Sequence, residues 1–171
     1  MSLTKQNLKD LLPSSTLLIN EICKDLTSKG KTIYQFGFGQ SPFPVPDSIV
    51  QALKNNAHQK DYLPSKGLLE LRKSISYFLI NKGYKNLNHD NIIIGPGSKE
   101  LMFLLQIAFD GEIILPVPSW VSYAPQAIIA KNKYHWIQTE KNTNWHISPE
   151  HIDKIASQIE SKNKLIILNS P

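Results

Sequence analysis

The sequence predicts an α/β fold in which a sheet of substantial parallel character is covered by helices on both faces. After Gly83, short apolar runs alternate with segments of helical periodicity. In addition, 41% of the 171 residues are hydrophobic, which is enough apolar material for one buried core. The apolar runs that we expect to form strands are 92–94, 112–115, 134–137 and 165–168.

A first helix is predicted over residues 14–29, where apolar residues recur every four positions and Gly30 follows as a stop. Three prolines then fall within residues 42–46. Prolines at this density exclude a regular helix or a central strand. We therefore expect an extended arm here, and we place any domain boundary in this arm, near Val45.

Helical periodicity returns after the arm and again between the expected strands. One helix with an apolar face is predicted to begin near Pro46, and a second helix with an apolar face is predicted to end before Gly83. The clearest later helix has Ser148 as its N-cap and Pro149 in its first turn. The helices expected between the strands span 98–109, 120–130 and 149–160.

Composition argues against several functional classes. The longest apolar runs are far too short to span a bilayer, so we expect no signal peptide or membrane anchor. Cys23 is the only cysteine, which excludes an intramolecular disulfide and fits a cytoplasmic location. The net charge of +5 is scattered and Arg72 is the only arginine, so neither nucleic acid nor a membrane is an expected partner. The histidines form no HExxH pattern, and no metal site is predicted.

The strongest local signal for chemistry is the glycine-rich turn that joins the expected strand 92–94 to the expected helix 98–109. Such a turn leaves backbone N–H groups at the positive end of the helix free to hold an anion. The Ser98 hydroxyl and the Lys99 charge stand beside them. The turn is neither GxxxxGK[ST] nor GxGxxG, because Glu100 occupies the third glycine position. It is either a phosphate cradle or a tight turn followed by a helix that Ser98 caps.

Two aromatic residues have an open interpretation. Trp120 follows the expected strand 112–115, and open α/β sheets bind ligands beyond the carboxyl ends of their strands, so Trp120 and the Gly97 loop can face one crevice. Its indole can stack on an aromatic cofactor ring or pack between helix and sheet. Tyr62 lies in a polar loop and is either a surface tyrosine or a phenol aimed at a partner.

A hydrolase is set aside because no GxSxG elbow is present.

Five segments, in this order, resemble the N-terminal part of class I/II aminotransferases, the aspartate-aminotransferase superfamily of fold type I pyridoxal-phosphate enzymes. The resemblance runs from about Ile33 to Pro171. The segment 61–72 is similar to the family's Tyr-x-Pro-x-x-Gly-x-x-x-Leu-Arg element. The other segments are Gly37-Phe38-Gly39 with the Phe-Pro-x-Pro that follows, Gly97-Ser98-Lys99, Pro118-Ser119-Trp120, and Leu168-Asn169-Ser170-Pro171.

The resemblance implies how the chain would hold pyridoxal 5'-phosphate. Gly97, Ser98 and Lys99 would bind the cofactor phosphate, and Trp120 would stack on the pyridine ring. In a homodimer, Tyr62 would reach the phosphate bound by the neighbouring subunit. The family's Schiff-base lysine would lie beyond residue 171, so no catalytic residue is expected within the chain, and the 171-residue chain by itself is expected to be inactive.

The resemblance also implies the domain organisation and the substrate contact. The fold would be part of a three-layer α/β/α sandwich. Residues 1–45 would be the N-terminal helix and substrate arm of a small domain, and residues 46–171 the first part of the large cofactor-binding domain. Gly39 would approach the substrate carboxylate through its backbone amide. Ser41-Pro42 replaces the Pro-Asp of many relatives, which leaves the substrate subgroup open.

The implied activity is the transfer of an amino group between an amino acid and a 2-oxo acid. A carbon–sulfur lyase, a decarboxylase or a synthase of the same fold type would share every motif quoted above. A non-catalytic dimerisation or ligand-sensing module is a further alternative. A nucleotide-binding α/β domain is disfavoured by the failed GxGxxG.

Overall fold

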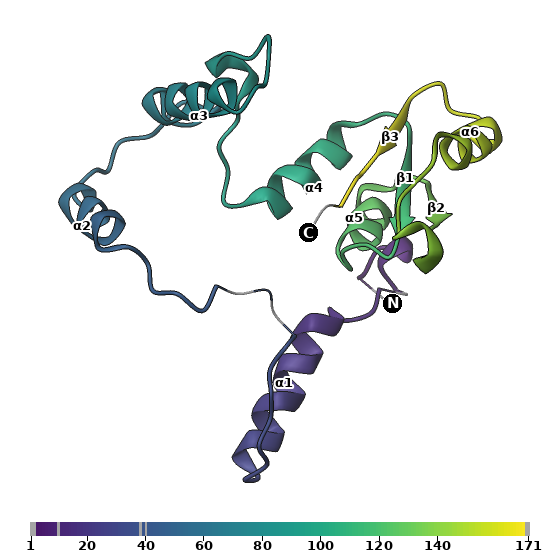
Figure 1. Cartoon of the computed structure of the whole chain (residues 1–171), viewed down its shortest axis with the longest axis horizontal. Coiled ribbons are helices and arrows are strands. Elements are labelled where there is room, and N and C mark those ends of the chain that lie inside the picture. Colours follow the sequence, from purple (N-terminus) through teal and green to yellow (C-terminus); the bar gives the residue numbers. More distant parts are fainter. Residues whose placement is uncertain (1–2, 10, 38, 40, 170–171) are drawn as a thin grey trace. The chain divides into compact units, whose positions relative to one another are not determined.

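The computed structural model (Figure 1) describes residues 3–9, 11–37, 39 and 41–169. By their internal contacts these divide into two compact units. One unit contains Met1–Phe38 and Lys99–Pro171, and the other contains Gly39–Ser98. The predicted domain boundary near Val45 concerns the complete fold of the family and stays a prediction. No helix in the described part of the chain has the length and apolar character needed to cross a membrane.

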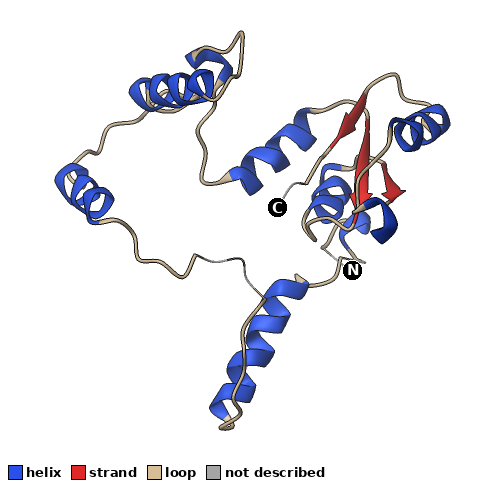
Figure 2. Ribbon diagram, in the orientation of Figure 1, coloured by secondary structure: helices blue, strands red, loops and turns tan. Residues whose placement is uncertain are grey.

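The first unit contains a parallel sheet with the strand order β2-β1-β3 (Figure 2). Its strands are β1 (Glu112–Val117), β2 (Tyr134–Gln138) and β3 (Lys164–Ile166). Its helices are α1 (Ser15–Ser28), α4 (Ser98–Ala108, of which Ser98 ends the other unit), α5 (Tyr123–Ala130) and α6 (Pro149–Gln158). Short 3₁₀ turns η1 (Gln6–Leu8) and η3 (Lys141–Thr143) complete the unit.

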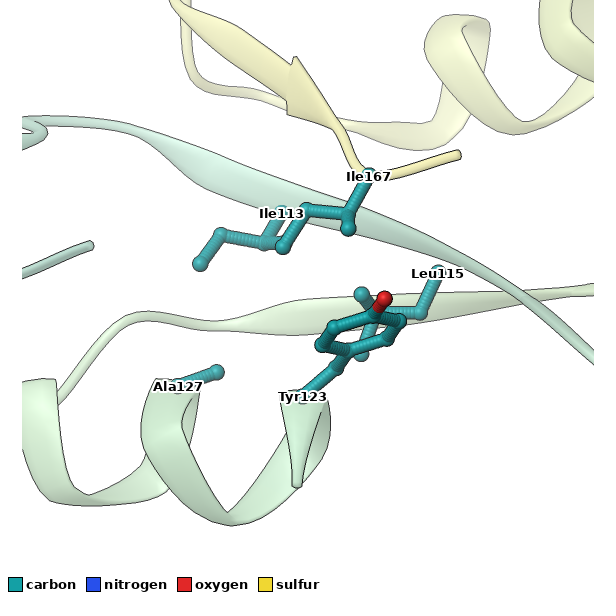
Figure 3. Close-up of a cluster of buried hydrophobic side chains, with 5 residues drawn as sticks. All are labelled: Ile113, Leu115, Tyr123, Ala127 and Ile167. Atoms are coloured by element: carbon teal, nitrogen blue, oxygen red, sulfur yellow. The ribbon is translucent and has the colours of Figure 1, made fainter. Parts of the chain in front are cut away.

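Successive residues of β1 pack on opposite faces of the sheet. Ile113 and Leu115 form one buried cluster with Tyr123 and Ala127 of α5, against which Met102 of α4 also packs (Figure 3). Ile114 belongs to a second cluster on the other face, with Ile137, Ile159 and three residues from α6 and the loop before it, Ile147, Ile152 and Ile155. Helices therefore cover both faces of a parallel sheet, and the predicted fold class is confirmed.

A proline lies near the end of the central strand without breaking it. In β1 the carbonyl of Ile114 accepts from the N–H of Ile167, so even-numbered residues turn their backbone polar groups toward β3. Pro116 therefore faces the β3 side, but the β1–β3 register ends at Ile114. The missing N–H falls where the ladder has already ended, which is the position that a strand tolerates for proline.

Helix α5 begins at Tyr123, so the prediction of a helix starting at Trp120 was wrong by three residues. The reason is Pro125. In a helix that began at Trp120, Pro125 would lie in the interior, where its missing N–H and its ring would break the backbone hydrogen bonding. With Tyr123 as the first residue, Pro125 falls in the first turn, where N–H groups have no intrahelical partner. Trp120 consequently lies in the loop after β1.

Two strand predictions need correction. Residues 92–94 are not a strand, because no strand of the described chain pairs with them; the N–H of Ile94 instead donates to the carbonyl of Lys66, at 3.0 Å. The last strand spans Lys164–Ile166 rather than residues 165–168. By contrast, α6 begins as predicted, with Ser148 as N-cap and Pro149 as first residue; the Ser148 hydroxyl accepts from the N–H of His151.

The second unit contains α2 (Asp47–Asn56), α3 (Leu69–Asn81) and the 3₁₀ turn η2 (His89–Asn91). The buried side chain of Arg72 in α3 connects two loops of this unit by hydrogen bonds. Its Nε donates to the carbonyl of Gly67 at 3.2 Å, its Nη1 donates to the carbonyl of His89 at 2.8 Å, and Asp90 lies 3.7 Å from it. The only arginine of the sequence is therefore a structural residue that fixes the loop leading into α3.

Helix α1 confirms the first predicted helix, and no helix or strand interrupts the described residues of the arm that follows. Phe38 and Gln40, as well as Ser170 and Pro171 of the last segment of the resemblance, lie outside the described residues. The remaining predicted helices and strands match the structure to within a few residues at each end.

Gly67 is held where no side chain fits. Its φ is +90°, and a Cβ built on it would lie 2.5 Å from Cβ of Ile94. Gly67→Ala should lower the free energy of unfolding, measured by urea denaturation, both through the unfavourable φ and by about 1–3 kcal/mol of overpacking. Gly83→Ala is the matched control, because Gly83 has a φ of +96° in the same unit but nothing within 4 Å of the position that a Cβ would take. Equal losses in the two variants would contradict the close approach.

A buried carboxylate, that of Glu112, joins the three strands at the amino end of the sheet. Glu112 Oε2 and His135 Nε2 lie 2.5 Å apart, and Glu112 Oε1 accepts from the N–H of Ser161 in the loop before β3. The hydrogen bond with His135, followed by that of Ser161 and the charge of Lys133, lowers the pKa of Glu112 below its ordinary value of 4.5, although partial burial opposes the shift.

The lowered pKa of Glu112 gives the stability a pH dependence of defined sign. The folded state favours the carboxylate, so its contribution is fully present above pH 4.5 and is lost as the pH falls through the lower pKa of the folded state. Unfolding measured from pH 7 down to about pH 3 should thus show a loss that Glu112→Gln reduces. Exposed Glu160→Gln should leave the profile unchanged. A Glu112→Gln profile parallel to that of the wild-type protein would refute this role.

Candidate functional site

Four segments of the first unit meet beyond the carboxyl ends of β1 and β3. They contribute Lys99 from the first turn of α4, Trp120 from the loop after β1, Tyr123 from the start of α5, and Asn169 from the chain after β3. Each of these residues contacts the next one, as the distances for each pair show. The position agrees with the general rule that open α/β sheets bind ligands at this end.

The glycine turn before α4 has the local geometry of an anion site. Gly97 has a φ of +96°, which favours glycine, and a Cβ built on it would meet nothing within 4 Å. Residues 96–100 are exposed, and α4 begins at Ser98. The first N–H groups of a helix have no intrahelical partner and point toward solvent at the positive end of its dipole. Glu100 is the acidic group of this first turn, and a bound anion would share the turn with it.

Lys99 and Trp120 are in contact. The Lys99 ammonium lies over the indole, with Nζ 5.2 Å from the ring centroid. Trp120 remains 37% exposed, so part of its ring is open to a ligand. Tyr123 meets the indole in an edge-to-face arrangement, with the centroids 5.6 Å apart and an interplanar angle of 84°. The structure thus brings together two of the residues predicted from separate motifs.

A buried amide pair connects α5 to the first turn of α4. Gln126 Nε2 donates to the carbonyl of Lys99 at 2.9 Å, and Gln106 Nε2 donates to Gln126 Oε1 at 3.0 Å. Gln106 is fully buried, and Asn132 donates to its backbone carbonyl at 2.7 Å. Polar groups this deep in a core are costly unless they are paired. The pair therefore fixes the start of α4 relative to α5.

Tyr62 and Gly39, like Gly97 and Ser98, belong to the second unit. Tyr62 is fully exposed in the loop before α3, and Gly39 is exposed in the arm, with nothing within 4 Å of a Cβ built on it. Ser98 is the first residue of α4 and directly precedes Lys99.

Sequence reasoning missed Gln126 and Tyr123 as parts of this site. Gln126 lies three residues after Tyr123, on the inner side of α5. A glutamine on the inner side of a helix cannot be told from an exposed one by residue type alone. The spacing from Trp120 to Tyr123 would have become informative only if Pro125 had been used to set the start of the helix.

The chain resembles known proteins over most of its length. The family described as aminotransferase class I and II matches residues 31–171. An aspartate aminotransferase of Bacillus subtilis (strain 168) is 34% identical over 167 residues, which are 94% of this chain and 42% of that protein. A probable aspartate/prephenate aminotransferase of Aquifex aeolicus (strain VF5) is 29% identical over 94% of this chain and 41% of its own length.

A solved structure gives the same fold. The aspartate aminotransferase from Rhizobium meliloti superposes with a TM-score of 0.85 at 23% sequence identity, covering 100% of this chain and 43% of that chain. The chain therefore spans less than half the length of these relatives.

Replacing Gln126 should destabilise the protein through the polar groups that it leaves unpaired. In Gln126→Leu, the Lys99 carbonyl and the Gln106 amide both lose a partner. We expect the free energy of unfolding to fall by about 1–3 kcal/mol. The double variant Gln106→Leu/Gln126→Leu should recover part of this loss, because it removes one orphaned group. Gln158→Leu, at an exposed position of α6, is the control. Additive losses in the double variant would argue against a coupled pair.

Proposed function

The chain belongs to the class I and II aminotransferase family, and from this we propose that it forms the part of a pyridoxal-phosphate-dependent aminotransferase that holds the cofactor phosphate and one face of its ring. The proposed reaction of the whole protein transfers an amino group between an amino acid and a 2-oxo acid. The names of the relatives support aspartate as the first amino acid to test.

The contact between Lys99 and Trp120 is the observation that carries the proposal. Pyridoxal phosphate combines a dianionic phosphate with an aromatic ring in one small molecule. The chain places an ammonium over an indole, at 5.2 Å from its centroid, and the same ammonium belongs to the first turn of a helix, where backbone N–H groups have no intrahelical partner. These residues fit both halves of the cofactor.

Each residue has a defined task in this proposal. The backbone N–H groups of Ser98 and Lys99, the Ser98 hydroxyl and the Lys99 ammonium bind the phosphate, beside the turn at Gly97, whose own N–H donates to the carbonyl of Gly95 at 2.7 Å. Trp120 orients the ring and excludes water from one of its faces. When bound, pyridoxal phosphate supplies an electron sink for the carbanion formed from the substrate. The residues proposed here bind and orient, and we propose that the 171 residues by themselves do not catalyse amino transfer.

Two further roles rest on the family membership. We propose that Gly39 approaches the substrate carboxylate through its backbone N–H, a role that the exposed backbone of the arm permits. We also propose a cytoplasmic homodimer in which Tyr62 reaches the phosphate bound by the partner. Full exposure of Tyr62 is compatible with this role, since an isologous interface would cover it.

Phosphate recognition can be tested without the aldehyde that modifies lysines at random. Pyridoxine 5'-phosphate should bind more tightly than pyridoxine, and Lys99→Gln should raise its dissociation constant roughly 10- to 100-fold, the equivalent of about 1.5–3 kcal/mol for a bond to a charged group. Titration calorimetry measures both constants. Lys24→Gln on α1, an exposed lysine, is the control. If Lys24→Gln and Lys99→Gln weaken binding equally, the phosphate is held by diffuse charge and the proposal fails.

A mixed dimer tests the cross-subunit role of Tyr62. Tyr62→Phe alone should weaken pyridoxine 5'-phosphate binding roughly tenfold or more. In a dimer of one Tyr62→Phe chain and one Lys99→Gln chain, shared sites would leave one site with both defects and one with none. Half of the sites should therefore bind with wild-type affinity. If no site of the mixed dimer binds with wild-type affinity, Tyr62 acts within its own chain. If Tyr62→Phe alone binds the ligand unchanged, Tyr62 does not act at all.

A further inference from the structure

Tyr123 is a buried aromatic residue that contacts the candidate site from the side of the hydrophobic core. Only 7% of it is exposed, and its ring belongs to the cluster of Ile113 and Leu115 (Figure 3). Two contacts lead from this core outward. The ring meets the indole of Trp120, and the hydroxyl donates to Asn169 Oδ1 at 3.0 Å. One residue thus touches two segments at the carboxyl ends of different strands.

We propose that Tyr123 is a positioning residue that sets the plane of the Trp120 indole and the orientation of the Asn169 amide for a ligand bound beyond the strand ends. The proposal rests on the proposed function, because it assumes that the ligand is a phosphorylated pyridine. It assigns roles to two residues of the candidate site: Tyr123 acts through its neighbours, and Asn169 faces the ligand.

The ring of Tyr123 is suited to hold the indole. Trp120 lies in the loop after β1, and its carbonyl accepts from the N–H of Tyr123 at 3.2 Å, so its backbone is also joined to Tyr123. The edge-to-face contact at 84° restricts the indole from one edge, while the Lys99 ammonium lies over its face. Tyr123 is itself fixed, since it is buried against β1 and is the first residue of α5. Trp120, a loop residue, is thereby oriented by Tyr123, whose position is fixed by the hydrophobic core.

The hydroxyl of Tyr123 determines which end of the Asn169 amide is available. A phenol that donates to Oδ1 holds the amide oxygen, so the two N–H groups of Nδ2 point away from the ring. Nδ2 has no hydrogen-bond partner within the described part of the chain, and Asn169 is exposed. The side chain therefore offers a donor toward the space beyond β3. The hydroxyl oxygen attached to the pyridine ring of pyridoxine 5'-phosphate is a matching acceptor.

The chain contains a comparable pair that lacks these features. Tyr134 and Trp136 on β2 also meet edge to face, with centroids 5.4 Å apart and an angle of 81°. Tyr134 makes no side-chain hydrogen bond within the described residues, and it lies at the start of its strand rather than at the carboxyl end. The pair serves as an internal control for effects of removing any tyrosine hydroxyl beside a tryptophan.

The test uses the 171-residue chain in a background with Trp136→Phe and Trp145→Phe, so that Trp120 is the only fluorophore of its kind. Binding of pyridoxine 5'-phosphate and of inorganic phosphate is followed by Trp120 emission and by calorimetry. Tyr123→Phe keeps the ring and removes the hydroxyl. It should raise the dissociation constant for pyridoxine 5'-phosphate about five- to twentyfold and leave that for inorganic phosphate unchanged, since the phosphate site lies at α4.

Asn169→Ala should reproduce the effect of Tyr123→Phe, and the double variant should be no worse than either single one. Tyr134→Phe, made in the chain that keeps Trp136 and Trp145 and compared with that chain by calorimetry, should change neither constant. Tyr123→Leu should additionally reduce the near-ultraviolet circular dichroism of Trp120 in the absence of any ligand, because the ring contact is lost.

Any of three results would overturn the proposal. The first is a Tyr123→Phe variant that binds both ligands like the parent background. The second is an equal loss of affinity for both ligands, which marks a merely structural role. The third is additivity of the Tyr123→Phe and Asn169→Ala effects.

Failure of the proposed function is a separate outcome, because the parent background would then not bind pyridoxine 5'-phosphate at all. In that case an unchanged circular dichroism of Trp120 in Tyr123→Leu would overturn the positioning role as well, and a reduced one would support it.

Discussion

The structure of the first unit depends on the burial of β1 on both faces. Ile113 and Leu115 are completely buried against α4 and α5, and Ile114 is buried against α6. A strand with apolar side chains on both sides is stable only between two helical layers, so the chain must cross the sheet repeatedly. These crossings bring the loop after β1, the start of α5 and the end of β3 to the same edge. The candidate site is a consequence of this burial.

Polar contacts then give the edge its detailed shape. Gln126 holds the first turn of α4 by its Lys99 carbonyl, and the Tyr123 hydroxyl holds the Asn169 amide. Both donors come from the inner side of α5, where an unpaired polar group would be costly. The same helix therefore sets the positions of the anion-binding turn and of the strand end. The ammonium of Lys99 and the ring of Trp120 meet above it, and this juxtaposition supports a ligand with a phosphate and an aromatic ring.

Much of the fold could be predicted because its signals are local. The start of α6 is determined by adjacent residues, Ser148 and Pro149. The apolar periodicity of β1 and α3 identifies these two elements without knowledge of the segments that pack against them. The failures involve information from elsewhere in the chain. Residues 92–94 look like a strand, but a strand requires a neighbour, and none pairs with them among the described residues. The motifs predicted Lys99 and Trp120 as site residues, whereas the roles of Tyr123 and Gln126 depend on which groups the fold places opposite them.

The central claim is that the start of α4 binds a phosphate whose attached ring rests on Trp120. The most direct measurement is a titration of the ¹⁵N-labelled chain with pyridoxine 5'-phosphate, followed by backbone and indole N–H resonances. The account predicts that the amides of Ser98 and Lys99 and the indole N–H of Trp120 shift together along one saturable curve. The amide of Glu150 at the start of α6, another helix amino end, should stay in place. Shifts at the start of α6, or shifts spread over surface lysines while Ser98 and Lys99 do not move, would contradict the account.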